Sequence, residues 1–370
     1  MESGDTILNS VQLSIVSPDC HERGAVCFKA GERVELIDPM AKQPELIKEI
    51  ETLLAADGRV DTALSVVFFK DRLAYKLKRE IKTGFVDYST LRKRKAMCER
   101  EFLINKKNSP DLYIAVAAVC RGRDGALKLW GGKGPLPGVP VEYLVEMNRF
   151  REKDLLSNLA RAGSLDSAIS DVLIERVAAM HAAAPRVPAG NYDKKFRKAV
   201  DISIRQFRES AAGVLPPDAW RDVSAKLLRA FERCAPVLKK RGKSNIKDCH
   251  GDLHLGNVCL YGGRPRVFDA VEFNPEFTHI DTFYDLAFLL MDYHHHRMPR
   301  QAERAADKYL AAAGLDRADF AALMPLYMGL RAVIRSSISA AGSKCVRGEP
   351  QRRLRAEAVR YHGEALEYLE

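Results

Sequence analysis

The 370-residue sequence predicts an α+β protein in which a small part built on antiparallel strands precedes a larger, mainly helical part. Three observations predict this class. Apolar, β-prone runs and turn residues alternate between Thr62 and Met147, and helical periodicity dominates from Asp154 onward. A short strand-rich stretch, His250 to Phe273, interrupts the helical part. The length allows either two domains or one unit with two lobes.

The strand-rich part contains two candidate helices and three candidate strand regions. We expect a helix at 44–56, a hairpin at 62–78 broken by Lys70-Asp71-Arg72, a helix at 88–107 with Asp87 or Ser89 as its cap, and strands at 113–121 and 139–147. The glycine-rich stretch Gly131 to Gly138 precedes a strand and not a helix. We therefore expect it to be a hairpin loop that does not bind phosphate.

The remaining elements are helical, and the chain divides into three parts. The helical patterns cover 169–184, 194–212, 220–239, 285–293, 301–313 and 319–339. Residues 1–39 contain short extended segments at 11–16 and 34–37 and form an N-terminal extension of unknown role. We expect an N-terminal lobe at 40–147, with one helix beside its sheet, and a C-terminal lobe at 148–370, with a hinge near Met147.

Composition limits the classes of function. The net charge of +10 and pI near 9.1 suit an anionic ligand such as a nucleotide. Basic residues cluster at 92–95, 239–243 and 352–355. These clusters lack interleaved aromatic residues, so solvated helix faces are expected and nucleic acid is an unlikely partner. Eight cysteines are scattered without a C-x-x-C pair, and no apolar run approaches a membrane span. The first ten residues carry acids and no basic segment, so we expect no signal peptide, no membrane and a cytoplasmic location.

The most specific motif is His250-Gly251-Asp252-Leu253-His254-Leu255-Gly256-Asn257, followed twelve residues after Asn257 by Asp269. Phosphoryl transfer requires these residue types together. The acceptor hydroxyl needs a carboxylate that orients it, and magnesium needs a carboxylate and an amide oxygen near the phosphates. In a tight loop, an Asp with an Asn five residues later can serve both purposes, and a following hairpin can bring a second Asp to the metal.

These motifs resemble the aminoglycoside phosphotransferase and choline kinase branch of the protein-kinase-like superfamily, and a bacterial aminoglycoside phosphotransferase-like subfamily most closely. The resemblance covers roughly residues 45–370 and is supported by the segments at 73–78, 84–91, 270–274 and 285–292. It implies a bilobal protein-kinase-like fold. It also implies that Asp252 is catalytic, that Asn257 and Asp269 bind magnesium, and that Asp285 and His250 support the catalytic loop.

A lysine on a strand, paired with a glutamate from the next helix, is expected to bind the nucleotide phosphates. Alternation places Ala74, Lys76 and Lys78 on one face of the strand at 73–78. Lys76 is the first choice and Lys78 the competitor. Glu101 is favoured over Glu99 as the partner because the sequence around Glu101 resembles the corresponding sequence of that subfamily.

Three further features bear on the site. Glu146 and Met147 end a strand where a hinge would hold adenine through backbone groups. Glu272 either approaches the metal or acceptor hydroxyl or bridges loops. The hairpin at 62–78 has no glycine between Val66 and Arg72, so a glycine-rich phosphate loop is absent there, which argues against a protein kinase more than against a small-molecule kinase.

The sequence therefore predicts a kinase that uses ATP or GTP with Mg²⁺ and phosphorylates a hydroxyl of a small molecule. A sugar or amino alcohol is the first guess, and an aminoglycoside-like acceptor is less expected for a chain of charge +10. Two alternatives stay open: a pseudokinase or protein-partner module that binds nucleotide without turnover, and a protein kinase. Asp285 follows only sixteen positions after Asp269, which leaves little room for an activation segment.

Overall fold

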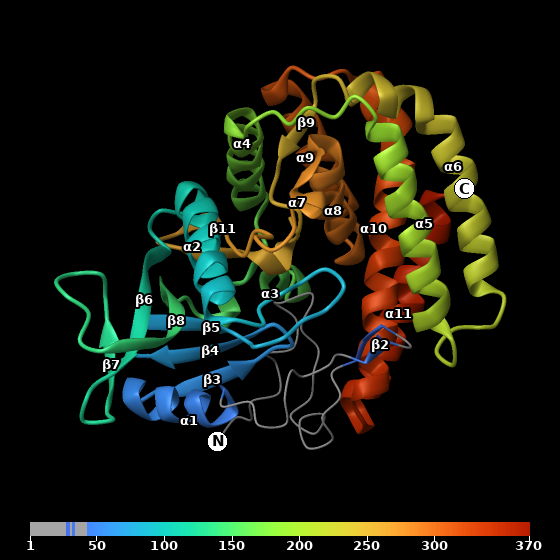
Figure 1. The fold of residues 1–370 in the computed structure, drawn as a ribbon. Coiled ribbons are helices and arrows are strands. Elements are labelled where there is room, and N and C mark those ends of the chain that lie inside the picture. Colours follow the sequence, from blue (N-terminus) through green and yellow to red (C-terminus); the bar gives the residue numbers. More distant parts are fainter. Residues whose placement is uncertain (1–26, 30–31, 34–42) are drawn as a thin grey trace. The chain divides into compact units, whose positions relative to one another are not determined.

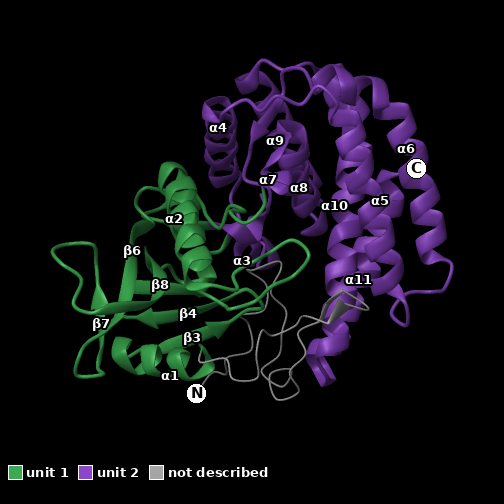
Figure 2. Cartoon of the chain, in the orientation of Figure 1, with its two compact units in different colours: residues 1–26, 33–155, 259–274 green, residues 27–32, 156–258, 275–370 purple. Residues whose placement is uncertain are grey.

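The computed structural model describes residues 27–29, 32–33 and 43–370. The expected extended segments at 11–16 and 34–37 lie outside these residues. Two short strands, β1 (Cys27–Lys29) and β2 (Glu32–Arg33), pair with each other. The described residues, including those of β1 and β2, fall into two compact units (Figures 1 and 2). In the described residues, unit 1 comprises 33, 43–155 and 259–274, and unit 2 comprises 27–29, 32, 156–258 and 275–370.

Unit 1 contains a six-stranded antiparallel sheet. In spatial order its strands are β3 (Gly58–Asp61), β4 (Ser65–Lys70), β5 (Leu73–Lys78), β8 (Val139–Asn148), β6 (Tyr113–Arg121) and β7 (Leu127–Trp130). The predicted hairpin is confirmed as β4 and β5, with Ser65 opposite Lys78 and Lys70 opposite Leu73. The sequence analysis missed β3 and β7, which are four residues long and contain little apolar alternation.

The prediction that residues 131–138 form a hairpin loop was wrong. The strands on either side of this stretch, β7 and β8, both pair with β6, one on each edge, so the stretch crosses the end of β6. The true hairpin joins β6 to β7. Both strands can pair with β6 because a central strand offers hydrogen-bonding groups on both edges.

Two helices contact the sheet of unit 1, one for each of the helical stretches predicted at 44–56 and 88–107, whereas only one helix was expected beside the sheet. Tyr75 and Leu77 of β5 belong to the core cluster that includes Ile47 and Ile50 of α1 (Gln43–Leu54). Ala74 belongs to the other core cluster, with Cys98 of α2 (Leu91–Asn108). The predicted alternation of β5 between two faces is confirmed, because each face contacts a different helix.

The prediction for the start of α2 was wrong. The cap is Thr90, whose side chain accepts a hydrogen bond from the Lys93 amide. Asp87 instead accepts hydrogen bonds from Ser89 and Lys93. Tyr88 belongs to an extended segment, since its amide donates to the Ile81 carbonyl. Local composition favoured a helix here, but pairing with the preceding chain keeps 87–88 extended.

The motif region contributes a hairpin to unit 1. Strands β10 (Val258–Tyr261) and β11 (Arg264–Val267) pair across a turn at Gly262 and Gly263, both of which have positive φ. This is the hairpin expected between Asn257 and Asp269. Residues 259–274 belong to unit 1, whereas the predicted lobe boundaries place all of 148–370 in the C-terminal lobe.

Unit 2 is mainly helical, as predicted. Its helices are α3 (Leu156–Arg161), α4 (Ser167–Ala183), α5 (Tyr192–Ala211), α6 (Ala219–Arg241), the short α7 (Pro275–Thr278), α8 (Thr282–His295), α9 (Pro299–Ala313), α10 (Arg317–Cys345) and α11 (Gly348–Tyr368). Strands β9 (Ile246–Asp248) and β12 (His279–Asp281) form a small antiparallel pair.

Helix α10 is the centre of this unit. It packs against α5, α6, α8 and α11 (Figure 1). Helix α8 is buried along nearly its whole length. This burial agrees with its mostly apolar sequence between Phe283 and Met291. Among the helices that the structure describes, none is both long and apolar enough to cross a membrane.

Candidate active site

The predicted site residues fall into two groups, one in each unit. Unit 1 holds Lys76, Lys78, Glu101, Glu146, Met147, Asp269 and Glu272, and unit 2 holds His250, Asp252, Asn257 and Asp285. The mixed group in unit 1 brings residues from β5, α2 and the segment after β11 into contact, although up to 194 residues separate them in sequence.

Both candidate lysines of unit 1 bind the same glutamate. Lys76 Nζ lies 2.9 Å from Glu101 Oε1 and 2.5 Å from Asp269 Oδ1. Lys78 Nζ lies 2.6 Å from Glu101 Oε2 and also donates to Glu272 Oε1. The two lysines reach one partner because residues two apart on a strand point to the same side. The structure therefore connects both candidates instead of choosing between them.

The lysines and carboxylates of this group affect one another's pKa values. Burial raises the pKa of Glu101, but Lys76 and Lys78 outweigh it and hold that pKa at about 2. Burial lowers the pKa of each lysine, but the adjacent carboxylates outweigh it and hold the pKa of Lys76 and Lys78 well above its ordinary value. The pKa of Asp269 is raised, because burial and the charge of Glu101 outweigh Lys76. Both lysines and Glu101 are therefore charged at neutral pH.

Asp269 has a left-handed backbone conformation, with φ of 61°. A residue other than glycine is uncommon there, and it persists only when its surroundings hold it. The Asp269 amide donates to Tyr113 Oη at 3.1 Å, and the Ala270 amide donates to Asn105 Oδ1 at 3.0 Å. Asn105 in turn donates to the Glu101 carbonyl. The carboxylate that contacts Lys76 is thus positioned by α2 and β6.

Glu272 accepts a second hydrogen bond, from Tyr88 Oη at 2.6 Å. Lys78 Nζ also lies 5.1 Å from the centre of the Tyr88 ring. The sequence analysis missed Tyr88, Asn105 and Tyr113. Tyr88 was assigned to a helix, and no local signal marks any of the three, because their partners lie 156 to 184 residues away.

Glu146 and Met147 lie inside β8. Glu146 stands opposite Tyr75 on one side and Ala115 on the other, and Met147 stands opposite Ala74 and Tyr113. A central strand directs its backbone groups to its neighbours. The predicted contact of the backbone groups of these residues with a nucleotide stays a prediction.

In unit 2, Asn257 is fixed against Asp252. Its Nδ2 donates to the Asp252 carbonyl at 3.0 Å and to Asp252 Oδ2 at 2.9 Å. Two acceptors on the same side fix which amide atom is nitrogen. The other atom, Oδ1, is buried and has no hydrogen-bond partner among the described residues. An amide oxygen without a partner fits a hard cation such as Mg²⁺, which takes oxygen ligands.

Histidines surround Asp252. The Asp252 amide donates to His250 Nδ1 at 3.2 Å, and His254 Nε2 lies 3.5 Å from Asp252 Oδ2. His254 Nδ1 accepts from the Gly256 amide, so its proton belongs on Nε2, toward Asp252. Burial raises the pKa of Asp252, but His254, His250 and Arg331 outweigh it and hold the pKa at about 2. Asp252 is therefore a carboxylate at every physiological pH.

Asp285 holds the start of the motif loop. It accepts hydrogen bonds from the amides of His250 at 3.0 Å and Gly251 at 2.9 Å, and His181 Nε2 lies 3.1 Å from Oδ2. Gly251 has φ of 84°, which a residue with a Cβ rarely adopts. This backbone conformation of Gly251 lets the amides of His250 and Gly251 both face the Asp285 carboxylate.

Asp292 performs the same task further along the loop, since it accepts from the Leu255 amide at 2.8 Å. The sequence analysis missed Asp292. Its spacing was the available signal, because residues seven apart on a helix share a face and Asp285 was already assigned to the site. The helical pattern predicted at 285–293 is confirmed, since it lies within α8, which ends at His295.

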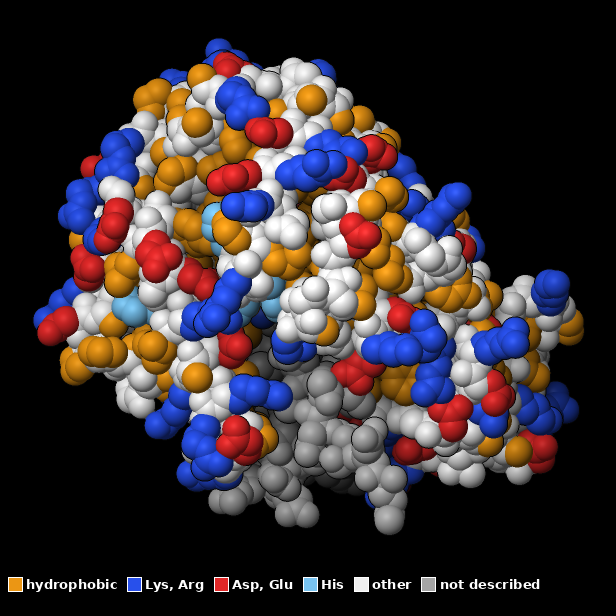
Figure 3. Space-filling model, turned by 180° about the vertical axis from the view of Figure 1, so that it is seen from behind, with side chains coloured by type: hydrophobic (Ala, Val, Ile, Leu, Met, Phe, Trp, Pro, Cys, Tyr) orange, Lys and Arg blue, Asp and Glu red, His pale blue; other side chains and the backbone are white. Residues whose placement is uncertain are grey.

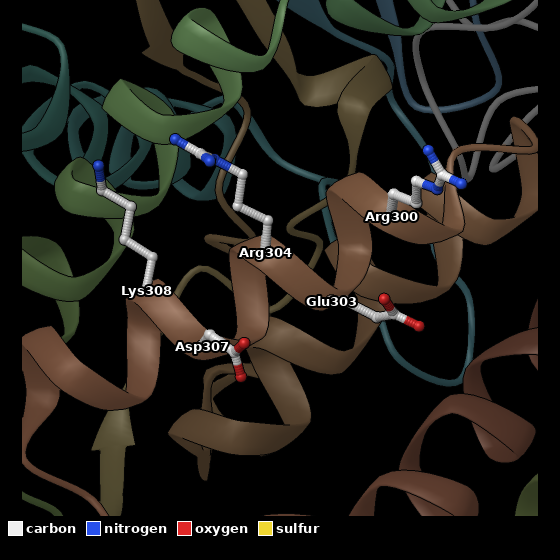
Figure 4. A pocket seen from close by; sticks show the side chains of 5 residues that line it. All are labelled: Arg300, Glu303, Arg304, Asp307 and Lys308. Carbon is white, nitrogen blue, oxygen red and sulfur yellow. The ribbon is translucent and has the colours of Figure 1, made fainter.

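Other candidate positions among the described residues are occupied by ordinary contacts. His181, Cys249 and Asp285 place ligand atoms within 4.8 Å of one another, but His181 is already bonded to Asp285 and to Tyr309 Oη. A pocket on α9 is lined by Arg300, Glu303, Arg304, Asp307 and Lys308, whose side chains point to both sides of one helix (Figure 4). Arg304 and Lys308 pair with Asp171 of α4.

A second pocket lies in unit 1 beside Tyr88. It is lined by residues 83–88, by Lys93, Ala96 and Met97 of α2, and by Phe273 and Asn274.

On the surface drawn in Figure 3, lysine and arginine side chains are interspersed with acidic and apolar ones. The expectation that nucleic acid is not a partner stays a prediction.

Comparison with known proteins gives a family match. Residues 152–323 match the model of the phosphotransferase enzyme family, and this range includes Asp252, Asn257, Asp269 and Asp285. The uncharacterized protein Rv2004c of Mycobacterium tuberculosis is 27% identical over 324 residues, which are 84% of this chain and 59% of that protein. An uncharacterized protein of Mycobacterium bovis matches with the same values. The chain thus spans about 59% of the length of these curated relatives.

Solved structures with a similar chain course include two small-molecule kinases. An ethanolamine kinase of Plasmodium vivax has a TM-score of 0.48 at 11% identity, covering 89% of this chain and 90% of its own. A microcompartment-associated aminopropanol kinase has a TM-score of 0.48 at 16% identity, covering 87% of this chain and 95% of its own.

Proposed function

We propose that this chain, which is related to the phosphotransferase enzyme family through residues 152–323, transfers the terminal phosphoryl group of ATP or GTP to a hydroxyl of a small molecule. The observation that carries the proposal is the Asp252–Asn257 pair. One hydrogen bond orients both groups, leaving an ionised carboxylate next to an amide oxygen that lacks a partner. This is the pair of functions that phosphoryl transfer needs.

In the proposed reaction, Asp252 accepts a hydrogen bond from the acceptor hydroxyl and directs its oxygen at the phosphorus. A carboxylate whose pKa is about 2 is a weak base, so its main contribution is orientation, and it takes the proton only as the new bond forms. Lys76 neutralises charge on the nucleotide phosphates while Glu101 holds it in place.

Asn257 and Asp269 would hold the magnesium ion. The ion would supply charge neutralisation for the phosphate oxygens. Asp269 contacts the Lys76 ammonium through Oδ1. A carboxylate has two oxygens, so it can bind a metal ion in addition to this lysine. The raised pKa of Asp269 would return to lower values next to a divalent cation, because an opposite charge favours the ionised form.

A small acceptor is favoured over a protein acceptor by the chain between Asp269 and Asp285. Most of this segment is occupied by α7, β12 and the first turn of α8. It therefore lacks the length for an activation segment that would bind a peptide.

The test is magnesium-dependent ADP release from ATP with a panel of sugars, amino alcohols, aminoglycosides and hydroxy acids. We expect Asp252→Asn to lower turnover roughly 10²- to 10⁴-fold while nucleotide binding persists. Asp218→Asn, which changes an exposed aspartate before α6, is the matched control and should behave like the parent protein. Unchanged turnover in Asp252→Asn would contradict the proposal, and nucleotide binding without turnover for any acceptor would favour a pseudokinase.

A further inference from the structure

An arginine in unit 2 is buried with N–H groups that lack a hydrogen-bond partner among the described residues. Arg331, on α10, is 7% exposed, and its Nε and Nη2 have no hydrogen-bond partner among the described residues. Its guanidinium lies over two rings of α8, 4.0 Å from the centre of Tyr284 and 4.7 Å from that of Phe288. The rings fix its position, but they do not satisfy its N–H groups.

A second buried arginine of the same unit shows the ordinary structural arrangement. Arg241 is 2% exposed and lies 3.6 Å from the centre of the Phe283 ring. It also donates to both oxygens of Asp281, at 2.6 and 2.7 Å. A buried guanidinium is costly unless a carboxylate or phosphate faces its planar N–H groups. Arg241 has that partner within the chain, whereas Nε and Nη2 of Arg331 have none among the described residues.

The Phe288 ring lies 4.7 Å from the Arg331 guanidinium and 5.2 Å from the His254 ring, and His254 Nε2 lies 3.5 Å from Asp252 Oδ2, which places Arg331 beside the motif loop. The charge of Arg331 contributes to the lowered pKa of both Asp252 and Asp285. Arg335 is one turn further along the same face of α10, and its charge also interacts with that of Asp252. Its Nη2 donates to Tyr361 Oη at 3.3 Å, whereas its Nε has no partner among the described residues. Two arginines thus border the region of the proposed hydroxyl-orienting carboxylate.

We propose that Arg331 binds an anionic group of the acceptor, so that the acceptor is a small hydroxylated acid carrying a carboxylate or phosphate. The acid group would take the unpartnered N–H groups of Arg331, and the hydroxyl would then reach Asp252. This inference rests on the proposed function and names its substrate class. It disfavours a polycationic acceptor, since a second cation beside Arg331 would be repelled.

The first experiment compares acceptors that differ by the acid group alone: glycerate and glycerol 3-phosphate against glycerol, and glucuronate against glucose. We expect the acid of at least one pair to be preferred in kcat/KM. In Arg331→Met this preference should fall roughly 10- to 100-fold, mainly through KM, as for the loss of a charge-assisted hydrogen bond. Arg331→Lys should keep part of the preference, because it keeps the charge but loses the planar N–H groups.

Arg208→Met is the matched control. Arg208 is exposed and lies 5.4 Å from the centre of the Trp220 ring, so this variant also removes one stacked arginine from unit 2. It should retain the preference of the parent protein. A fall of equal size in both variants would mean that net charge, and not a specific contact, sets the preference.

The second readout does not depend on turnover. Each acid that is preferred should raise the unfolding temperature of the parent protein and leave that of Arg331→Met unchanged. Neutral acceptors preferred over their acids, or acids that raise the unfolding temperature of neither protein, would overturn the inference. In the first of these outcomes, magnesium-dependent phosphorylation that Asp252→Asn abolishes would still support the proposed function.

Discussion

At the scale of single residues, burial distinguishes the two lysines that share Glu101. Lys78 is 2% exposed, and its ammonium is enclosed by Glu101, Glu272 and the Tyr88 ring. The Lys76 side chain is 13% exposed. A lysine that must meet phosphate needs an approachable ammonium, so Lys76 suits nucleotide binding, and Lys78 suits holding Glu101 and Glu272 in place.

This division predicts different defects for the two lysines. Lys76→Met should lower turnover roughly 10²-fold or more, because it removes a cation from the transferred phosphate. Lys78→Met should lower the free energy of unfolding by about 3–5 kcal/mol, because it leaves two buried carboxylates with too few partners. Steady-state kinetics and urea unfolding measure the two effects.

Lys70→Met, at the exposed end of β4, is the control for both variants and should change neither quantity. If Lys78→Met loses turnover at full stability while Lys76→Met remains active, the assignment of the two lysines is reversed.

At the scale of elements, α8 organises the motif loop of unit 2. Its aspartates Asp285 and Asp292 accept hydrogen bonds from loop amides. Its N-cap, Asp281, is bonded to Arg241 and to Tyr327. The helix is therefore anchored at its start and supports the loop from one face.

The other end of α8 is joined to α11 through His295. Its Nε2 lies 3.0 Å from Glu357 and its Nδ1 3.0 Å from Glu364, and its ring stacks on Tyr361 at 3.9 Å between centres. Burial lowers the pKa of His295, but the two glutamates outweigh it and raise the pKa above its ordinary value. Since each ring nitrogen faces a carboxylate, the protonated form is the one that fits.

The contact between His295 and the two glutamates makes the stability of the protein depend on pH, and the raised pKa fixes the sign of that dependence. A histidine whose pKa is raised on folding adds stability below its unfolded pKa of about 6.5, and that stability is lost as pH rises through the folded value. The free energy of unfolding of the parent protein minus that of His295→Gln should therefore decrease as pH rises from 6 to 9. His294, His296 and His362 have lowered pKa values and the opposite sign, so only the difference between variants isolates His295. A difference that is independent of pH would contradict the assignment.

At the scale of the whole molecule, the proposed nucleotide and metal residues are distributed over both units. Lys76, Glu101 and Asp269 belong to unit 1, and Asp252 and Asn257 belong to unit 2. The proposed function therefore predicts that the nucleotide stabilises both units. A ligand stabilises each unit that it contacts, by mass action.

The two tryptophans make this testable, because Trp130 lies in β7 of unit 1 and Trp220 in α6 of unit 2. In Trp130→Phe and Trp220→Phe proteins, the fluorescence of the remaining tryptophan reports one unit. Magnesium and ATP together should raise the unfolding midpoint seen by both, and Asn257→Ala should reduce the effect of magnesium. A midpoint that shifts in one unit alone would mean that residues of a single unit bind the nucleotide.

The sequence by itself determined the features that depend on neighbouring residues. Alternation predicted the β4–β5 hairpin and its two faces, and helical periodicity predicted α4, α5, α6, α8, α9 and α10 of unit 2 but missed α11. The spacing from Asp252 to Asp269 predicted a loop followed by a hairpin. Each of these follows from local backbone geometry, which a single sequence expresses directly.

Only the tertiary structure decided which distant groups meet. It inserted β8 between β5 and β6, joined both Lys78 and Tyr88 to Glu272, and placed Asp292 on the Leu255 amide. It also left Nε and Nη2 of Arg331 without a hydrogen-bond partner among the described residues. The physical reason is that these contacts depend on how elements pack. Whether a buried charge is satisfied depends on groups that may lie more than a hundred residues away, and no local pattern records them.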